Sequence, residues 1–185
     1  MIEGDQEPNM SISQKESAAH LRSCELGCLS SEELGKLGPF AAMTLIHDKK
    51  VALCEELENI ADCLPSNVDE LTCLSVAAKL LPILRLAHEY EESVIFPTYE
   101  KAVADTGQNM SIDRLRGEHI SDECFAADLT GILLKIGHGG YVDQAETFRF
   151  MLRGFFYSLR RHVAFENEHV VPIIRKSTLS HPNRF

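Results

Sequence analysis

The stretch HVAFENEHVVP, at residues 162–172, sets His162 and Glu166 four residues apart within a largely apolar run. Side chains at this spacing lie on the same face of an α-helix. Apolar residues extend that face in both directions at intervals of three and four, which is the period of a helix with one buried side. The sequence therefore predicts a helix over residues 142–176 whose buried face carries both polar groups.

Three more apolar stripes of the same period precede this one and predict helices over residues 39–64, 68–104 and 112–136. Pro82 and Pro97 fall inside the second helix and are expected to bend or locally break it, because proline cannot donate a helical hydrogen bond. Short connections between long helices favour antiparallel neighbours. The predicted fold is all-α, an up-down-up-down antiparallel four-helix bundle.

The expected helix boundaries rest on residues with known positional preferences. Pro39 suits the first position of its helix, and Asn67 and Ser111 are candidate N-caps. The run GHGG at residues 137–140 is expected to end the third helix, because glycine adopts the backbone conformation found after a helix C-terminus. One further short helix is expected around residues 17–26.

The composition, with 185 residues, 44% hydrophobic and 25% charged, is that of one globular domain. We expect the bundle at residues 37–178, a polar N-terminal extension at 1–36 and a short tail at 179–185. The formal net charge of −10 disfavours binding to nucleic acids and to anionic membranes. The N-terminus lacks the pattern of a signal peptide, and no apolar stretch of ~18 residues is apparent. We therefore expect a cytoplasmic protein.

The six cysteines do not overturn this expectation. Four of the six cysteines lie inside helical patterns and are expected to be small buried side chains, namely Cys54, Cys63, Cys73 and Cys124. The other two, Cys24 and Cys28, form a C-x3-C pair in the N-terminal extension. This pair is either a redox or metal pair or two unrelated thiols.

Each predicted helix carries one histidine in the middle of its apolar stripe, and three of these histidines are followed four residues later by a glutamate. In an antiparallel bundle the four histidines fall at a similar level along the axis. A single histidine on such a face is usually a hydrogen-bonded core residue. Four of them beside buried carboxylates are better explained by a metal ion, which offsets the cost of burying charge. The candidate ligands are His47, His88, Glu92, His119, Glu123, His162 and Glu166.

Imidazole and carboxylate ligands suit iron, manganese or zinc. The motifs together resemble the hemerythrin-like HHE cation-binding family. The matching pieces are LIHD at residues 45–48, HEYEE at 88–92 with Phe96 and Pro97 after it, Glu118 with His119, and HVAFENEH at 162–169. The resemblance covers about residues 38–176. It implies a non-haem di-iron centre, with manganese or zinc as substitutes. It makes the four histidines terminal ligands and Glu92 and Glu166 bridging carboxylates.

Glu123 departs from the family pattern, because oxygen-carrying hemerythrins have a second histidine at that place. Glu123 either ligates the metal or supports a ligand from outside. Glu91 is a rival to Glu92, since a bend at Pro97 could shift the helical register. Glu89 and His169 are candidates for supporting roles, against the simpler interpretation of a solvated charge or a hydrogen-bonded core side chain.

The resemblance implies a protein that binds a small diatomic ligand, O2 or NO, for sensing, storage or protection. Four histidines with two H-x3-E pairs also resemble the iron-centre repair and nitric-oxide-responsive branch of the family. The alternative function is therefore a redox or iron-handling protein that reduces NO or peroxide with an electron donor. A third hypothesis is a metal-stabilised interaction protein without redox chemistry. Neither a G-x-S-x-G motif nor a P-loop is present in the sequence.

Overall fold

The computed structural model describes residues 30–104, 112–142 and 144–180, and within these ranges its regular structure is entirely helical, which confirms the all-α prediction. The elements in chain order are α2 (Ser31–Lys36), α3 (Pro39–Cys63), α4 (Glu70–Tyr90), a π-helical turn η1 (Glu91–Ile95), α5 (Phe96–Val103), α6 (Asp113–Gly137), α7 (Ala145–His169) and α8 (Val171–Ser180). The short helix expected around residues 17–26 and the candidate cap Ser111 lie outside the described residues.

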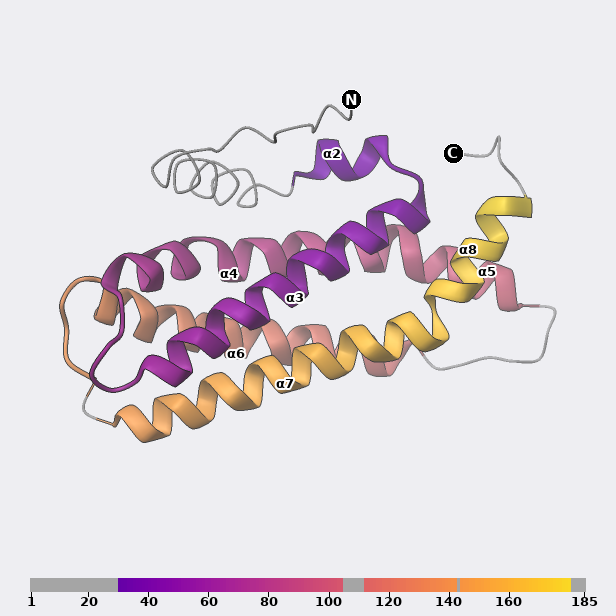
Figure 1. Cartoon of the computed structure of the whole chain (residues 1–185). Coiled ribbons are helices and arrows are strands. Elements are labelled where there is room, and N and C mark those ends of the chain that lie inside the picture. The colour runs from indigo at the N-terminus through magenta and orange to yellow at the C-terminus, as the bar shows by residue number, and fades with distance from the viewer. Residues whose placement is uncertain (1–29, 105–111, 143, 181–185) are drawn as a thin grey trace, which may run out of the picture.

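Four long helices, α3, α4, α6 and α7, lie side by side along the length of the molecule (Figure 1). The α3–α4 and α6–α7 connections lie together at one end, which we call the loop end, and α5 and α8 lie at the other. The most extensive packing is between α4 and α6 and between α3 and α7. Each helix therefore buries one stripe against two neighbours, as its period predicts.

The buried side chains form layers along the helix axes. The loop end holds a cluster that is apolar throughout, and its members include Leu53, Leu57, Leu129, Phe148 and Phe156. The opposite end holds a second apolar cluster, which includes Met43, Phe96, Leu115 and Ile174. A polar layer lies between them: along α3 it falls between Met43 and Leu53, and along α6 it falls between Leu115 and Ala126.

Asp69, rather than the expected Asn67, caps the start of α4, because its carboxylate accepts a hydrogen bond of 2.8 Å from the backbone N–H of Thr72. The glycines at the end of α6 act as predicted. Gly139 has a φ of +77°, and the Gly140 N–H donates to the Lys135 carbonyl at 2.9 Å. A Cβ at Gly140 would lie 2.6 Å from that same carbonyl oxygen, so only glycine fits there.

The second predicted helix is divided at its C-terminal third. Pro82 lies on the exposed face of α4 without ending it. Before Pro97 the backbone widens into the π-helical turn η1, in which the Phe96 N–H donates to the carbonyl of Glu91, five residues earlier. Pro97 cannot donate to the carbonyl of Ser93, and a π-helical turn is one way for a helix to absorb that loss.

The fourth predicted helix is also two helices. α7 ends at His169 and α8 begins at Val171, with Val170 between them. Pro172 explains the break, because it has no N–H to donate to the carbonyl of Glu168 and its ring clashes with a continuing helix. The continuous helix expected over residues 142–176 is therefore corrected to two.

Part of the predicted polar extension packs onto the long helices. Within α2, Leu34 is fully buried against Ala42, Ile46 and Ala87. Ser30 caps this short helix with a capping box, accepting from the backbone N–H of Glu33. The hydrophobic core therefore includes a residue that precedes the expected start of the bundle at residue 37.

The segment Glu70–Val103 is long and apolar enough to cross a membrane by length and composition alone, contrary to the expectation that no such stretch exists. The core helix of a bundle passes the same test. Here the segment packs against α3 and α6 and carries His88 and Glu91 into the polar layer.

The four cysteines within the described residues divide into two buried and two exposed ones. Cys54 and Cys73 are buried as expected, and burial raises the pKa of the Cys54 thiol to about 12 and that of Cys73 to about 11. Cys63 and Cys124 are exposed, contrary to expectation, because they lie on helix faces that point away from the core. The pair at positions 24 and 28 lies outside the described residues.

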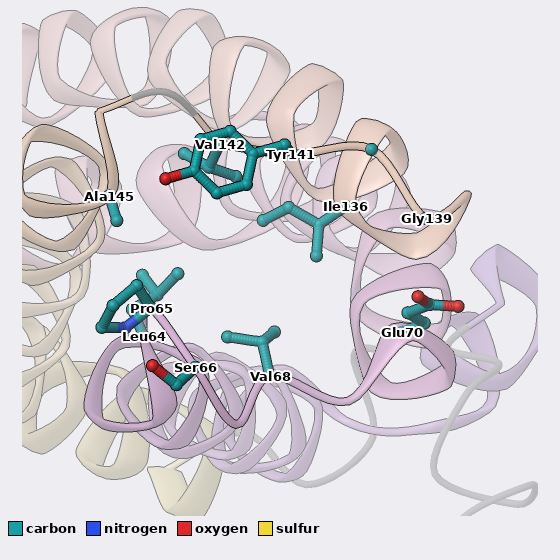
Figure 2. Close-up of a pocket in the computed structure, with 11 residues that line it drawn as sticks. Leu64, Pro65, Ser66, Val68, Glu70, Ile136, Gly139, Tyr141, Val142 and Ala145 are labelled. Carbon is teal, nitrogen blue, oxygen red and sulfur yellow. The ribbon is translucent and has the colours of Figure 1, made fainter.

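A hollow of about 220 Å³ lies at the loop end (Figure 2), and no residue of the central polar layer lines it. Pro65, Ser66 and Val68 line one side of it, and Ile136 and Val142 line the other. Its walls come from the two connections and the adjoining helix ends, so it is a gap at the end of the apolar cluster.

Candidate metal centre

All of the buried polar or charged side chains in the described part of the chain gather in the polar layer. They are His47, Lys50, His88, Glu91, His119, Asp122, His162 and Glu166. They come from α3, α4, η1, α6 and α7, and none is more than 6% exposed. A buried ionic group costs free energy unless it is paired, so a set of this size indicates a role other than stability.

Glu166 is in contact with two histidines of the layer. Its Oε2 atom lies 3.0 Å from Nε2 of His47 and 3.5 Å from Nε2 of His162. Across the layer, Oε2 of Glu91 lies 3.2 Å from Nε2 of His119. The ring of His88 stacks on that of His119, with centroids 3.9 Å apart. Imidazole nitrogens and carboxylate oxygens from four helical elements therefore point at one small volume.

The outward nitrogens of the four histidines all have partners. Nδ1 of His47 lies 3.0 Å from Asn167 Oδ1, Nδ1 of His88 lies 3.0 Å from Glu123, Nδ1 of His119 lies 2.8 Å from Glu92, and Nδ1 of His162 lies 2.9 Å from Glu118. Each partner atom is an oxygen that accepts, so Nδ1 must donate. A neutral ring then presents the lone pair of Nε2 to the interior, which is the form that binds a metal ion.

Five of the inward atoms, by contrast, lack hydrogen-bond partners among the described residues. This holds for Nε2 of His88, His119 and His162, for Oε1 of Glu166 and for Oδ2 of Asp122. The 3.2 Å contact between His119 and Glu91 lacks hydrogen-bond geometry. Buried polar atoms without partners are rare, and a group of inward lone pairs with none is what a bound cation would satisfy.

A lysine lies inside the layer. The ammonium of Lys50 is fully buried and lies 2.7 and 2.8 Å from the two carboxylate oxygens of Glu91, and 4.0 Å from Oε2 of Glu166. Burial opposes its charge, but the two carboxylates outweigh burial and raise the pKa of Lys50. The same ammonium, against the effect of burial, holds the pKa of Glu166 well below its usual range.

The other shifts have the same causes. Burial, followed by the charge of Lys50, lowers the pKa of His88, so that ring is neutral. Burial raises the pKa of Asp122, opposed by His162 and Lys50. Burial opposes the charged form of His162 too, but its contact with Glu166 raises the pKa of His162.

The structure places Glu91 inward where the sequence favoured Glu92. Glu91 is fully buried, whereas the side chain of Glu92 is 41% exposed and supports His119 from outside. The π-helical turn begins at Glu91, so the helical register changes at this residue. In the sequence, Glu91 is a rival to Glu92 because Pro97 could shift the helical register. The π-helical turn before Pro97 is such a shift.

Glu123 lies outside the layer. Its carboxylate pairs with Nδ1 of His88 and lies 3.4 Å from Nε of Arg85, so it supports a histidine rather than pointing inward. Glu89 is exposed. His169 is also exposed and packs its ring against Phe165, with centroids 4.5 Å apart. Neither of these two residues reaches the layer.

Sequence reasoning missed four residues of this centre. Lys50 and Asp122 each lie three residues after a histidine, on the same helix face, and a search at that spacing as well as at four would have found them. Glu118 and Asn167 hold the outward nitrogens of histidines on other helices. No spacing within one helix could reveal such a contact.

Four of the buried residues offer one donor atom each within 4.8 Å of one another, which suits a metal ion. They are Glu91, His119, His162 and Glu166. Two nitrogen and two oxygen donors of this kind fit a divalent ion such as iron, manganese or zinc.

Comparison with known proteins gives one family. A model of the hemerythrin HHE cation binding domain matches residues 38–174, a span that contains the whole polar layer. No curated protein and no solved structure matches the chain. The match covers most of the sequence and agrees with the cluster of histidines and carboxylates. The chain therefore belongs to the hemerythrin family of HHE cation-binding domains.

Proposed function

We propose that the four long helices form the antiparallel up-down-up-down bundle of this family, and that their polar layer binds non-haem iron for the uptake of O2 or NO. The observation that carries the metal assignment is the set of inward Nε2 atoms of His88, His119 and His162, which are buried without a hydrogen-bond partner among the described residues. A cation in the layer would satisfy these lone pairs and the adjoining carboxylates at once.

The types of side chain in the polar layer match the ligand types expected for the metal centre of this family. The four histidines with Glu91 and Glu166 give the mixed imidazole and carboxylate set that the family resemblance implies for two iron ions, with Glu91 in the place expected for Glu92. Lys50 is the buried group with which a second ion would compete. Iron, when bound, would supply an open coordination position and electrons for a small diatomic ligand.

The outer oxygens would fix the ring orientations. Glu92, Glu118 and Glu123 each accept from the Nδ1 atom of one histidine, which holds the Nε2 lone pair toward the interior before any metal arrives. Such pairs raise the basicity of the ring and strengthen its bond to a metal. The rings are therefore preorganised for binding rather than recruited by it.

Apolar neighbours would keep water from the layer. Leu84, Phe155 and Leu159 are all fully buried on the loop-end side of the histidines. On the outer face, a surface hollow of about 400 Å³ is lined by His119 together with Glu92 and Glu123. This hollow is the approach by which a diatomic molecule would reach the layer.

The test is the visible spectrum of protein loaded with Fe(II) without oxygen, recorded as air is admitted and then removed. Charge-transfer bands that appear with air and vanish on its removal are expected for a reversible binding protein. Bands that appear and persist would replace this proposal with the alternative, a redox or iron-handling protein that works with an electron donor. Protein that binds no iron at all would contradict both.

A further inference from the structure

We infer that Lys50 occupies, as a built-in cation, one of the two metal positions of this centre, so that the chain binds a single metal ion. The inference rests on the proposed metal centre. It is independent of which diatomic ligand binds there.

The first support is the position of the ammonium. Lys50 Nζ lies within hydrogen-bond distance of both oxygens of Glu91 and 4.0 Å from Glu166, the two fully buried glutamates that would hold a metal pair. Two metals in a shared site lie ~3.5–4 Å apart and draw on the same bridging oxygens. A second ion would have to displace the ammonium from the Glu91 oxygens that Lys50 now holds.

The second support is the division of the layer between helices. The four donors that lie within 4.8 Å of one another come from η1, α6 and α7, and none comes from α3. Lys50 enters from α3. One ion held by Glu91, His119, His162 and Glu166 would therefore leave the α3 side of the layer to the ammonium.

The third support is the charge of the layer. Three carboxylates, those of Glu91, Asp122 and Glu166, are buried with one ammonium, that of Lys50. With the carboxylates ionised and the histidines neutral, the forms that metal binding requires, they leave two negative charges, which one divalent ion neutralises. A second divalent ion would add uncompensated positive charge beside a buried ammonium, and charge of one sign is strongly unfavourable in a region sealed from water.

The experiment is to count metal ions in the full chain and in Lys50→Met, which keeps an unbranched side chain one atom shorter and removes its charge. The matched control is Lys49→Met, one residue away on α3 and outside the layer. Each protein is dialysed against excess Fe(II) without oxygen, and separately against Zn(II), and bound metal is measured by mass spectrometry. We expect one ion per chain in the wild type and in Lys49→Met, and two in Lys50→Met.

A second readout reports the same difference by spectroscopy. With Mn(II) as the probe, the wild type should give the electron paramagnetic resonance spectrum of an isolated ion, and Lys50→Met should give that of a coupled pair. Lys50→Gln, which keeps a hydrogen-bond donor near Glu91 without a charge, should behave as Lys50→Met does. Circular dichroism establishes that each variant is folded.

Two ions per wild-type chain would overturn the role of Lys50 and leave the metal centre intact, and this count does not depend on any variant folding. One ion in folded Lys50→Met and Lys50→Gln would also overturn it. No bound metal in the wild type would instead overturn the proposed function, and this inference with it.

Discussion

The loop-end cluster and the polar layer are built from the same helices, yet they differ in what their burial achieves. In the loop-end cluster every buried side chain is apolar, so each one contributes to the free energy of unfolding when it leaves water. In the polar layer eight charged or polar groups are buried, and their pairing at best balances the cost of removing them from water. The first region stabilises the fold, and the second is a binding site that the fold must carry.

The helical stripe is the same in both regions. On α7, Phe148 and Leu152 belong to the loop-end cluster, while His162 and Glu166 continue the same face into the polar layer. Residue identity on one stripe, rather than a change of fold, therefore separates the stabilising part of the helix from the binding part.

The largest effect should come from truncating the loop-end cluster. Phe148 is 1% exposed, and Phe148→Ala should lower the free energy of unfolding by about 3–5 kcal/mol through lost burial and a cavity. Urea denaturation of metal-free protein measures this. Phe150→Ala, at a site 76% exposed on the same helix, should change it by less than about 0.5 kcal/mol. A fall in metal bound per folded Phe148→Ala chain would break the separation of the two regions.

A smaller effect should follow from removing an outer support in the polar layer. Glu118→Gln leaves the ring of His162 without its carboxylate partner and should weaken metal binding by about 10–100-fold, with little change in metal-free stability. Equilibrium dialysis against Fe(II) measures the affinity. Asp128→Asn, at an exposed site on the same helix, is the control and should bind as the wild type does. Equal affinity in Glu118→Gln would show that the outer carboxylates do not prepare the site.

A still smaller effect concerns acid and the start of α4. Hydrogen bonds from the hydroxyl and backbone N–H of Thr72 lower the pKa of Asp69 below 3.8. Its contribution to stability is therefore complete above that pH and is lost as the pH falls through the lowered value. The difference in unfolding free energy between wild type and Asp69→Ala should shrink on acidification, as followed by urea denaturation at several pH values.

The matched control is Asp69→Asn, which keeps an N-cap without a titrating group, so its difference from Asp69→Ala should stay constant with pH. Added metal should leave unchanged the difference in unfolding free energy between the wild type and Asp69→Ala, because Asp69 lies at the loop end, away from the polar layer. A metal-dependent change would couple regions that the structure separates.

The smallest perturbation is chemical labelling of thiols. Cys63 and Cys124 are exposed and should react with N-ethylmaleimide at neutral pH in the folded protein. Cys54 and Cys73, with thiol pKa values raised to about 12 and about 11, should react only after denaturation. Mass spectrometry of proteolytic fragments locates the label. Native labelling of Cys54 would show that the loop-end cluster opens readily.

The sequence allowed the all-helical fold and the level of the histidines to be predicted, because both follow from spacing along one helix. The helix boundaries were less predictable. Pro97 and Pro172 each leave one backbone carbonyl of the preceding turn without a hydrogen-bond donor, and the sequence does not show how the backbone adjusts to that loss. The π-helical turn that brings Glu91 inward in place of Glu92 depends on that local adjustment.

The interior of the candidate site was only partly predictable. Lys50 lies on the same helix face as His47, but its role depends on its distance to Glu91, 41 residues away in the chain. The support that Glu118 gives His162 likewise joins two helices. Contacts of this kind follow from how helices pack, and a one-dimensional pattern does not contain them.

The most direct test of the metal centre compares His162→Ala with His138→Ala, both loaded with Fe(II) without oxygen. His162 is buried in the polar layer, whereas His138 is exposed at the end of α6. Metal content and melting temperature are measured with and without iron. We expect His162→Ala to lose most of its metal and the stabilisation that metal gives, about 2.7 kcal/mol at a free concentration one hundred times Kd, while His138→Ala keeps both. Unchanged iron content and unchanged stabilisation in His162→Ala would contradict the assignment of the polar layer as a metal centre.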